Sequence, residues 1–252
     1  FGRLLLPAAS LISFSGSAQA VAISWTPTSG INWSTAGNWT GGTPSGNELT
    51  FSTGGAAAAA GTVTNTVDSS VSVNSLLFNN TGSSYQTTSI SSGQTLTVAG
   101  ALAGAFTVNN TTAGSSNVTI TGAGTLAVTG GQTTTSFNVG SANAGGSGTA
   151  QTLNMAGLAN FSASVASFNI GNGQRGAGTV TLGTTNSITA TTLLLGGNTT
   201  TGGSTSTLNL GQTNTINAGV YVNNIVPKNL LVLQDGINRC VHRRVVGGKV
   251  GI

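Results

Sequence analysis

The chain has 252 residues, of which 4% are charged, 38% are hydrophobic and 39 are Gly. Ordinary soluble domains carry about 25% charged residues, so most of this surface must be built from uncharged Thr, Ser and Asn. Disordered chains combine low hydrophobicity with high net charge, and a mean hydropathy of +0.21 excludes that class.

The net charge of +4 comes from one end of the chain. Residues 1–227 hold two cations and two carboxylates, whereas residues 228–252 hold five cations and a single carboxylate, Asp235. The only Cys and the only His, Cys240 and His242, also lie in this segment. Five scattered cations are a weak electrostatic footprint for nucleic acid. We therefore expect no nucleic-acid partner.

Residues 1–20 have the pattern of a secretory signal peptide. Arg3 precedes an apolar stretch at 4–14, and Ala18-Gln19-Ala20 supplies the small residues of a cleavage site. A bilayer span takes about 20 residues, which is longer than this stretch. We expect a secreted, extracellular protein with no membrane span in this fragment. Because the sequence opens with Phe1 and not Met, we also expect its start to be truncated.

Residues 21–53 form a separate module that contains all three Trp residues. Trp25, Trp33 and Trp39 could cap the open end of the repeats that follow, since the terminal repeats of solenoids are commonly atypical. The alternative is an extracellular glycan-binding module, in which these rings stack on sugars. Capping is the interpretation that we favour.

Residues 54–226 read as short β-strands separated by turns. Thr, Val and Ile favour strands, and Gly, Asn and Ser favour turns. A sustained helical period is absent, so we expect almost no helix. The Ala-rich run at 56–60 is expected to be a loop. The expected strands before the clearest repeats are 62–67, 71–78, 89–90, 95–98 and 117–129.

A degenerate repeat occupies the second half of this region. Three segments, 148–171, 178–196 and 204–223, each contain two short apolar strands. The matching glycines Gly140, Gly171 and Gly196 are 31 and 25 residues apart. Self-similarity with a period of about 20–50 residues indicates a solenoid, in which each coil buries its apolar face on its neighbours.

The repeat favours an all-β fold with a parallel β-helix, or β-solenoid, and leaves an antiparallel β-sandwich as the alternative. In a β-helix, similar apolar residues recur at similar positions in each coil. The recurring Asn138 and Asn169 could form a stacked amide ladder or point to solvent. The side chains expected to be buried together are Phe137, Val139, Phe168, Ile170, Leu193, Leu195, Val220 and Val222.

Several segments resemble the autotransporter-associated β-strand repeat proteins, which are large secreted bacterial proteins. The segments are 32–39 (NWSTAGNW), 73–80 (VNSLLFNN), 92–100 (SGQTLTVAG) and 210–218 (LGQTNTINA). The resemblance covers about 21–226. It implies a right-handed β-helix passenger at the bacterial outer membrane and cell surface, acting as a stalk or an adhesin. Such proteins usually continue for many more coils.

The sequence lacks the sets of side chains that common catalytic mechanisms need. The carboxylates Glu48, Asp68 and Asp235 show no recognisable spacing, and a single His cannot build a triad. The Gly-rich run at 145–148 lacks the carboxylates of a calcium coil, and Cys240 with His242 falls short of a zinc site. We therefore expect no enzyme, no catalytic or metal-binding residues and no cofactor. Partners, if any, would be surface glycans or neighbouring cells.

Residues 227–252 diverge from everything before them. The composition changes abruptly at Pro227, as it would at a frameshift or at the end of a gene fragment as well as at a real domain. Apolar residues here lack alternation, and buried unpaired charges cost several kcal/mol each. We expect that 228–252 does not continue the stack, and is either loosely ordered or a strand laid along the last coil.

The leading hypothesis is a non-enzymatic structural solenoid. A third hypothesis, after stalk and glycan-binding module, is an ice-binding solenoid with flat rows of Thr. That function needs Thr-x-Thr at constant pitch, and the unequal repeat spacings argue against it.

Overall fold

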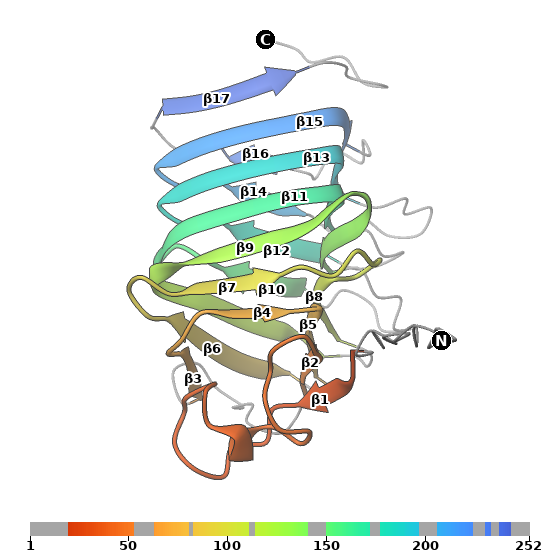
Figure 1. Ribbon diagram of the computed structural model, residues 1–252. Helices are drawn as coiled ribbons and strands as arrows, with labels where there is room; N and C mark the ends of the chain where they lie inside the picture. Colours follow the sequence, from red (N-terminus) through yellow and green to blue (C-terminus); the bar gives the residue numbers. More distant parts are fainter. Residues whose placement is uncertain are drawn as a thin grey trace, which may run out of the picture.

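The computed structural model describes residues 20–52, 63–80, 83–110, 114–140, 150–171, 177–196, 206–223, 230–232 and 237–242. The chain winds into a β-solenoid of about six turns, drawn from the side in Figure 1. All strand pairs are parallel, from β1 with β2 to β15 with β17. This confirms the β-helix and rules out the antiparallel sandwich. The expected signal peptide, up to residue 19, and the loop at 56–60 lie outside the described residues.

The strands of successive coils stack into three parallel sheets, which we call the three walls. One short 3-10 turn, η1 (Ala36–Asn38), lies in the Trp module. Strand β9 is long enough to run through all three walls, and β11, β13 and β15 run through two. The first wall consists of β3 (Thr64–Val67), β6 (Ser84–Ile90), the start of β9 (Ser116–Val139), β10 (Ala150–Asn154), β12 (Ala177–Thr181), β14 (Thr207–Asn209) and β16 (Leu230–Val232). The second wall consists of β4 (Val71–Val73), β7 (Thr95–Val98), the middle of β9, the first parts of β11 (Leu158–Ile170), β13 (Thr185–Leu195) and β15 (Thr213–Asn223), and β17 (Ile237–His242). The third wall consists of β1 (Ala22–Ser24), β2 (Glu48–Phe51), β5 (Ser75–Asn80), β8 (Phe106–Asn110), the end of β9 and the last parts of β11, β13 and β15.

Strand register stays constant although the coils differ in length. In the first wall, successive coils pair Thr64 with Thr87, 23 residues on, and Thr119 with Asn154, 35 residues on. The extra residues lie between the paired strands, so the pitch of the stack does not depend on coil length. The unequal spacings of 31 and 25 residues are therefore compatible with constant pitch, and the expectation drawn from them was wrong.

Inward side chains form a continuous apolar core. One column of Phe side chains runs through five coils, with ring centroids of neighbours 5.0, 6.2, 4.4 and 4.3 Å apart. Each of the five rings is 0% exposed. A parallel stack in register places like residues above one another, so three of the four neighbouring pairs are stacked and the pair Phe78–Phe106 is tilted by 58°. The column consists of Phe51, Phe78, Phe106, Phe137 and Phe168.

The predicted core residues are confirmed in three coils, but in the fourth coil the prediction is off by one residue. All six predicted residues from Phe137 to Leu195 are buried. In the next coil, however, Leu193 pairs with Tyr221 and Leu195 with Asn223, so Val220 and Val222 do not hold the expected positions. The register here follows from Asn186 pairing with Asn214 and Ile188 with Ile216 earlier in the same strands. The side chains of 220–223 lie outside the described residues.

The matching glycines of the repeat end the third-wall strands. Gly140, Gly171 and Gly196 have φ values of 76°, 72° and 82°. Residues with a Cβ rarely adopt this left-handed conformation, because the Cβ approaches the following carbonyl oxygen. The repeat therefore marks one corner of each coil, where only Gly turns the chain without strain.

Two strands of the tail lie on the last full coil. Strand β16 pairs with β14, and β17 pairs with β15, both in parallel. Parallel pairing uses backbone groups, and Arg239 holds the position opposite Thr215, whose own side chain is exposed. Residues 230–232 and 237–242 thus match the second form of the expectation, a strand laid along the last coil, and for these residues the expectation that the tail does not continue the stack is wrong.

Candidate functional surfaces

The three Trp side chains form one cluster at the N-terminal end of the solenoid. Trp25, Trp33 and Trp39 are 1%, 1% and 4% exposed. Trp39 lies edge-on to the other two, with centroid distances of 4.9 and 5.1 Å. All three rings contact Phe51, which begins the Phe column. Such burial is what a cap requires, and it leaves none of the three rings exposed as a platform for sugars.

One indole hydrogen bond ties this cluster to the first coil, and a second joins two of its members. The indole N–H of Trp33 donates to Oδ1 of Asn65 at 2.8 Å, and the indole N–H of Trp39 donates to the carbonyl oxygen of Trp33 at 3.0 Å. Asn38, fully buried, accepts hydrogen bonds at Oδ1 from the backbone N–H groups of Thr28 and Ser29, both at 3.0 Å. The module is thus held by polar contacts as well as by packed rings.

The two carboxylates of the described part have separate structural partners. Asp68, after β3, accepts hydrogen bonds from the backbone N–H of Ser34 at 3.0 Å and from the Ser34 hydroxyl. Glu48, at the start of β2, accepts a hydrogen bond from Nδ2 of Asn74 at 3.3 Å. Neither is paired with the other in the way that acid–base catalysis uses two carboxylates. Asp235 lies outside the described residues.

The Asp68 carboxyl gives a pH dependence of known sign. Partial burial acts to raise its pKa, but the hydrogen bonds from Ser34 and nearby backbone groups outweigh burial and place the pKa below its ordinary value. A lowered folded-state pKa means that the stabilisation is complete above the ordinary carboxyl pKa and is lost as pH falls through the folded-state pKa.

We therefore expect the melting temperature to be nearly constant from neutral pH down to the carboxyl range and then to fall modestly in acid. Thermal melts followed by circular dichroism at graded pH would measure this. In Asp68→Asn the acid decline should shrink and the neutral melting temperature should be slightly lower. An undiminished acid decline in this variant would contradict the assignment to Asp68.

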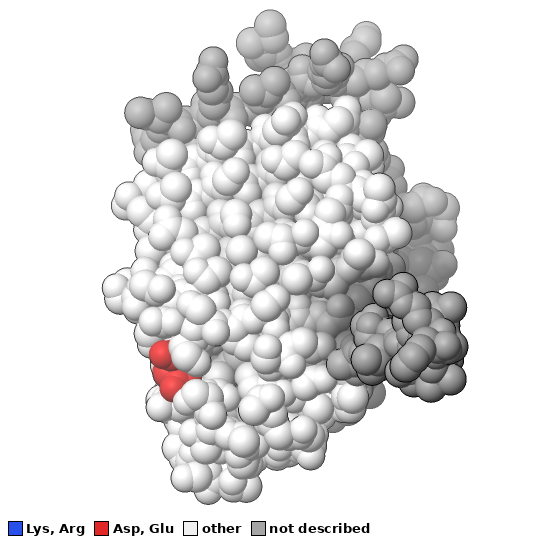
Figure 2. Space-filling view, viewed as in Figure 1, with Lys and Arg blue, Asp and Glu red and all other residues white. Residues whose placement is uncertain are grey.

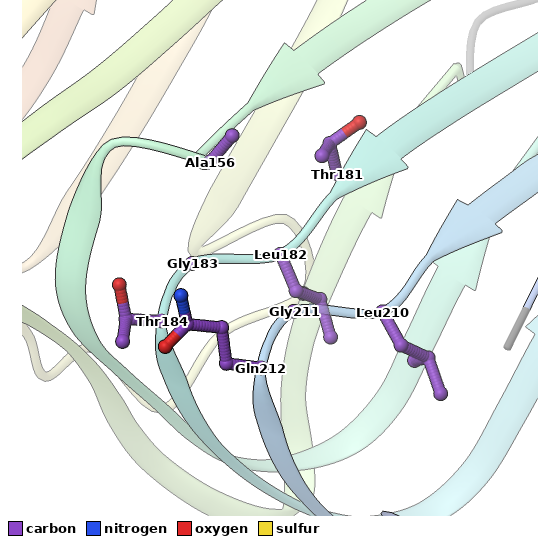
Figure 3. Close-up of a pocket in the computed structure, with 8 residues that line it drawn as sticks. All are labelled: Ala156, Thr181, Leu182, Gly183, Thr184, Leu210, Gly211 and Gln212. Carbon is purple, nitrogen blue, oxygen red and sulfur yellow. The ribbon is translucent and has the colours of Figure 1, made fainter. Parts of the chain in front are cut away.

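Two shallow hollows lie among the described residues. The larger, about 240 Å³, lies between the Trp module and the β3–β4 turn, and Ser and Thr line most of it. The smaller, about 180 Å³, lies at stacked corners of the later coils, with Thr184 and Gln212 on adjacent turns (Figure 3). Leu182 and Leu210 point away from these polar side chains and are buried in the core. Neither hollow is lined by a carboxylate, His, Cys or cation.

Asparagine ladders connect successive coils. Asn169 donates from Nδ2 to Oδ1 of Asn138 at 2.8 Å, which decides between the two positions expected for these residues. A second ladder, which the sequence analysis missed, joins Nδ2 of Asn186 to Oδ1 of Asn214 at 2.9 Å. Asn186 also binds both the N–H and the carbonyl oxygen of Gly183. The recurring Gly-x-x-Asn, at 183–186 and 211–214, is the sequence signal for this corner.

The described residues contain no group of three or more His, Cys, Asp or Glu that could hold a metal ion. Cys240 and His242 lie on β17 at the register positions opposite Ile216 and Ala218. Among the same residues, no helix has the length and apolar character to cross a membrane.

The comparisons with known proteins name no relative. No protein-family model, no curated protein and no solved structure matches the chain.

Proposed function

We propose that this chain is a non-enzymatic, secreted or surface-displayed bacterial β-solenoid, a structural stalk or adhesin-like passenger of the autotransporter-associated repeat type. The observation that carries the proposal is the parallel stack from β1 to β17, with a single apolar core that runs from Ile23 on β1 to Ile216 on β15. Such a stack adds length in equal steps of about 4.8 Å per coil, which suits a spacer better than a catalytic site.

The surface chemistry supports the same proposal. Outward positions carry uncharged Thr, Ser and Asn, and the described side chains include only two carboxylates, Glu48 and Asp68. A neutral hydroxyl surface stays hydrated and keeps its charge state over a wide pH range, as an extracellular spacer requires. Secretion is supported by the pattern of residues 1–20, and β1 begins at Ala22, just after the expected cleavage site.

Glycan binding by the Trp module is the competing function. Its chemistry needs exposed rings, and the three Trp residues are at most 4% exposed. The structure offers no specific observation that favours glycan binding. The Trp33→Ala variant tests it, because a sugar platform would lose glycan retention at unchanged stability.

Export provides the direct test. The chain, preceded by an initiator Met and expressed in a Gram-negative bacterium, should leave the cytoplasm, and its mature N-terminus should be Val21. The matched control is Leu5→Arg, which interrupts the apolar stretch and should retain the uncleaved chain in the cytoplasm. Cell fractionation and N-terminal sequencing give the answer. Cytoplasmic, uncleaved wild-type protein would contradict the proposal.

A further inference from the structure

The outward side of the second wall carries hydroxyl and amide side chains in straight columns. We call this surface, on β7, β9, β11, β13 and β15, the hydroxyl face. One column consists of Thr95, Thr125, Asn160, Thr185 and Thr213, each paired in register with the next. The column two residues further along the strands follows the same pairing, so the face is a two-dimensional array.

That second column contains Thr97, Ala127, Ser162, Ser187 and Thr215, so Thr-x-Thr itself occurs on β7 and β15 and is varied on the three strands between them. The residues between the two columns point inward, and those from Leu96 to Phe161 are buried in the core. The outward side chains of the two columns are Thr, Ser, Asn and one Ala. The side chains of Asn160 and, in the last two coils, of Thr185, Ser187, Thr213 and Thr215 are exposed, whereas the five other members of the two columns are half-buried.

The five strands of the hydroxyl face are electrically neutral, and beyond them the register position after Thr215 is Arg239 on β17. None of the strands β7, β9, β11, β13 and β15 contains Asp, Glu, Lys or Arg. Figure 2, in the same view as Figure 1, shows this face as uncharged, with a single acidic patch at the edge of the lower coils. A charged face would steer a charged partner, so the complement of this face is a neutral surface.

The spacing of the array points to the nature of that surface. Neighbouring coils lie about 4.8 Å apart, and residues two apart along a strand lie about 6.6 Å apart. These repeats are comparable to the separations of oxygen atoms on the exposed planes of hexagonal ice. We propose that the hydroxyl face binds ice, through Thr, Ser and Asn groups that hold water in an ice-like arrangement.

In the last two coils the second wall suits this role better than the first wall, which also carries Thr. In the first wall Thr179, Thr181 and Thr207 are half-buried, whereas their counterparts on the second wall of the same coils are exposed. A crystalline neutral polysaccharide is the main competing occupant. Proteins usually bind such a polysaccharide by stacking exposed aromatic rings on its sugars. The described outward positions on β7 to β15 of this face include no aromatic side chain.

The test measures incorporation of the whole chain into a slowly growing ice front, together with inhibition of ice recrystallisation. Wild-type protein should be enriched in the ice relative to an inert protein of similar size. Ser187→Tyr and Thr215→Tyr should each lower the ice-bound fraction about tenfold or more. The matched controls, Thr179→Tyr and Thr207→Tyr, lie on the same two coils but on the first wall, and should stay within about twofold of wild type.

Thermal melts establish whether each variant is folded. If Ser187→Tyr or Thr215→Tyr fails to fold, Ser187→Lys or Thr215→Lys takes its place in the test. Exclusion of wild-type protein from ice would overturn the proposal, as would equal losses in face variants and controls. Binding of wild type to chitin or cellulose powder, lost in the face variants while ice incorporation stays at background, would assign the face to a neutral polysaccharide instead.

Discussion

Phe168→Ala is expected to lower the free energy of unfolding by about 3–5 kcal/mol. The Phe168 ring is 0% exposed and stacks on Phe137 with centroids 4.3 Å apart and planes 6° from parallel. Truncation removes the ring from the continuous column and leaves a cavity between two coils. Because each coil of a solenoid contacts only its neighbours, the loss should concentrate in the coils next to β11. Chemical denaturation gives the magnitude, and amide hydrogen exchange gives the location.

Phe168→Leu is the matched control, since Leu193 holds the same register position one coil further on. A change of shape at nearly constant apolar character should cost less than about 1.5 kcal/mol. Thr189→Ala, on the outside of the next coil, should fall within about 0.5 kcal/mol of wild type. A cost below 1 kcal/mol for Phe168→Ala would contradict the stacked Phe column.

Trp33→Ala is expected to lower the free energy of unfolding by about 3–5 kcal/mol and to leave any glycan binding unchanged. Trp33 packs against Trp39 and Phe51, with centroids 5.1 and 5.7 Å away. Its indole N–H also satisfies Oδ1 of Asn65, which is 0% exposed. Loss of the ring would open the apolar end of the first coil to water. Thermal melts and retention on a glycan array measure the two properties separately.

Trp33→Phe separates the ring from its hydrogen bond. It keeps an aromatic side chain in the cluster but leaves Oδ1 of Asn65 without its donor, so a cost of about 1–3 kcal/mol is expected. Loss of glycan retention in Trp33→Ala at unchanged stability would reverse the assignment and favour the glycan-binding module.

The sequence was informative wherever one coil repeats the chemistry of another. Equivalent glycines, such as Gly171 and Gly196, lie at equivalent corners, and Phe137 pairs with Phe168 as the repeat predicts. Alternation of apolar and polar residues also predicted the strand β7 (Thr95–Val98) with its observed bounds. These features were predictable because a parallel stack in register selects the same side chain at each level.

The sequence was less informative where a one-residue offset decides the pairing. Leu193 was aligned with Val220, but it pairs with Tyr221. Two apolar runs can be matched by eye in either register, whereas the structure must satisfy the buried Asn186–Asn214 ladder in the same strands. The cost of leaving a buried amide unsatisfied, about 1–3 kcal/mol, exceeds the small difference between the two apolar alignments.

The sequence by itself determined an all-β repeat fold with a neutral exterior and favoured a parallel solenoid over an antiparallel sandwich, because composition and repeat indicate which residues point inward and which outward. Only the tertiary structure decided that the three Trp residues are buried, that β16 and β17 extend the stack, and that Thr, Ser and Asn form straight columns. The physical reason is that backbone pairing between coils sets the strand register, whereas it leaves the length of each coil free to vary. A one-dimensional repeat spacing therefore cannot reveal the two-dimensional array that the stacked strands create.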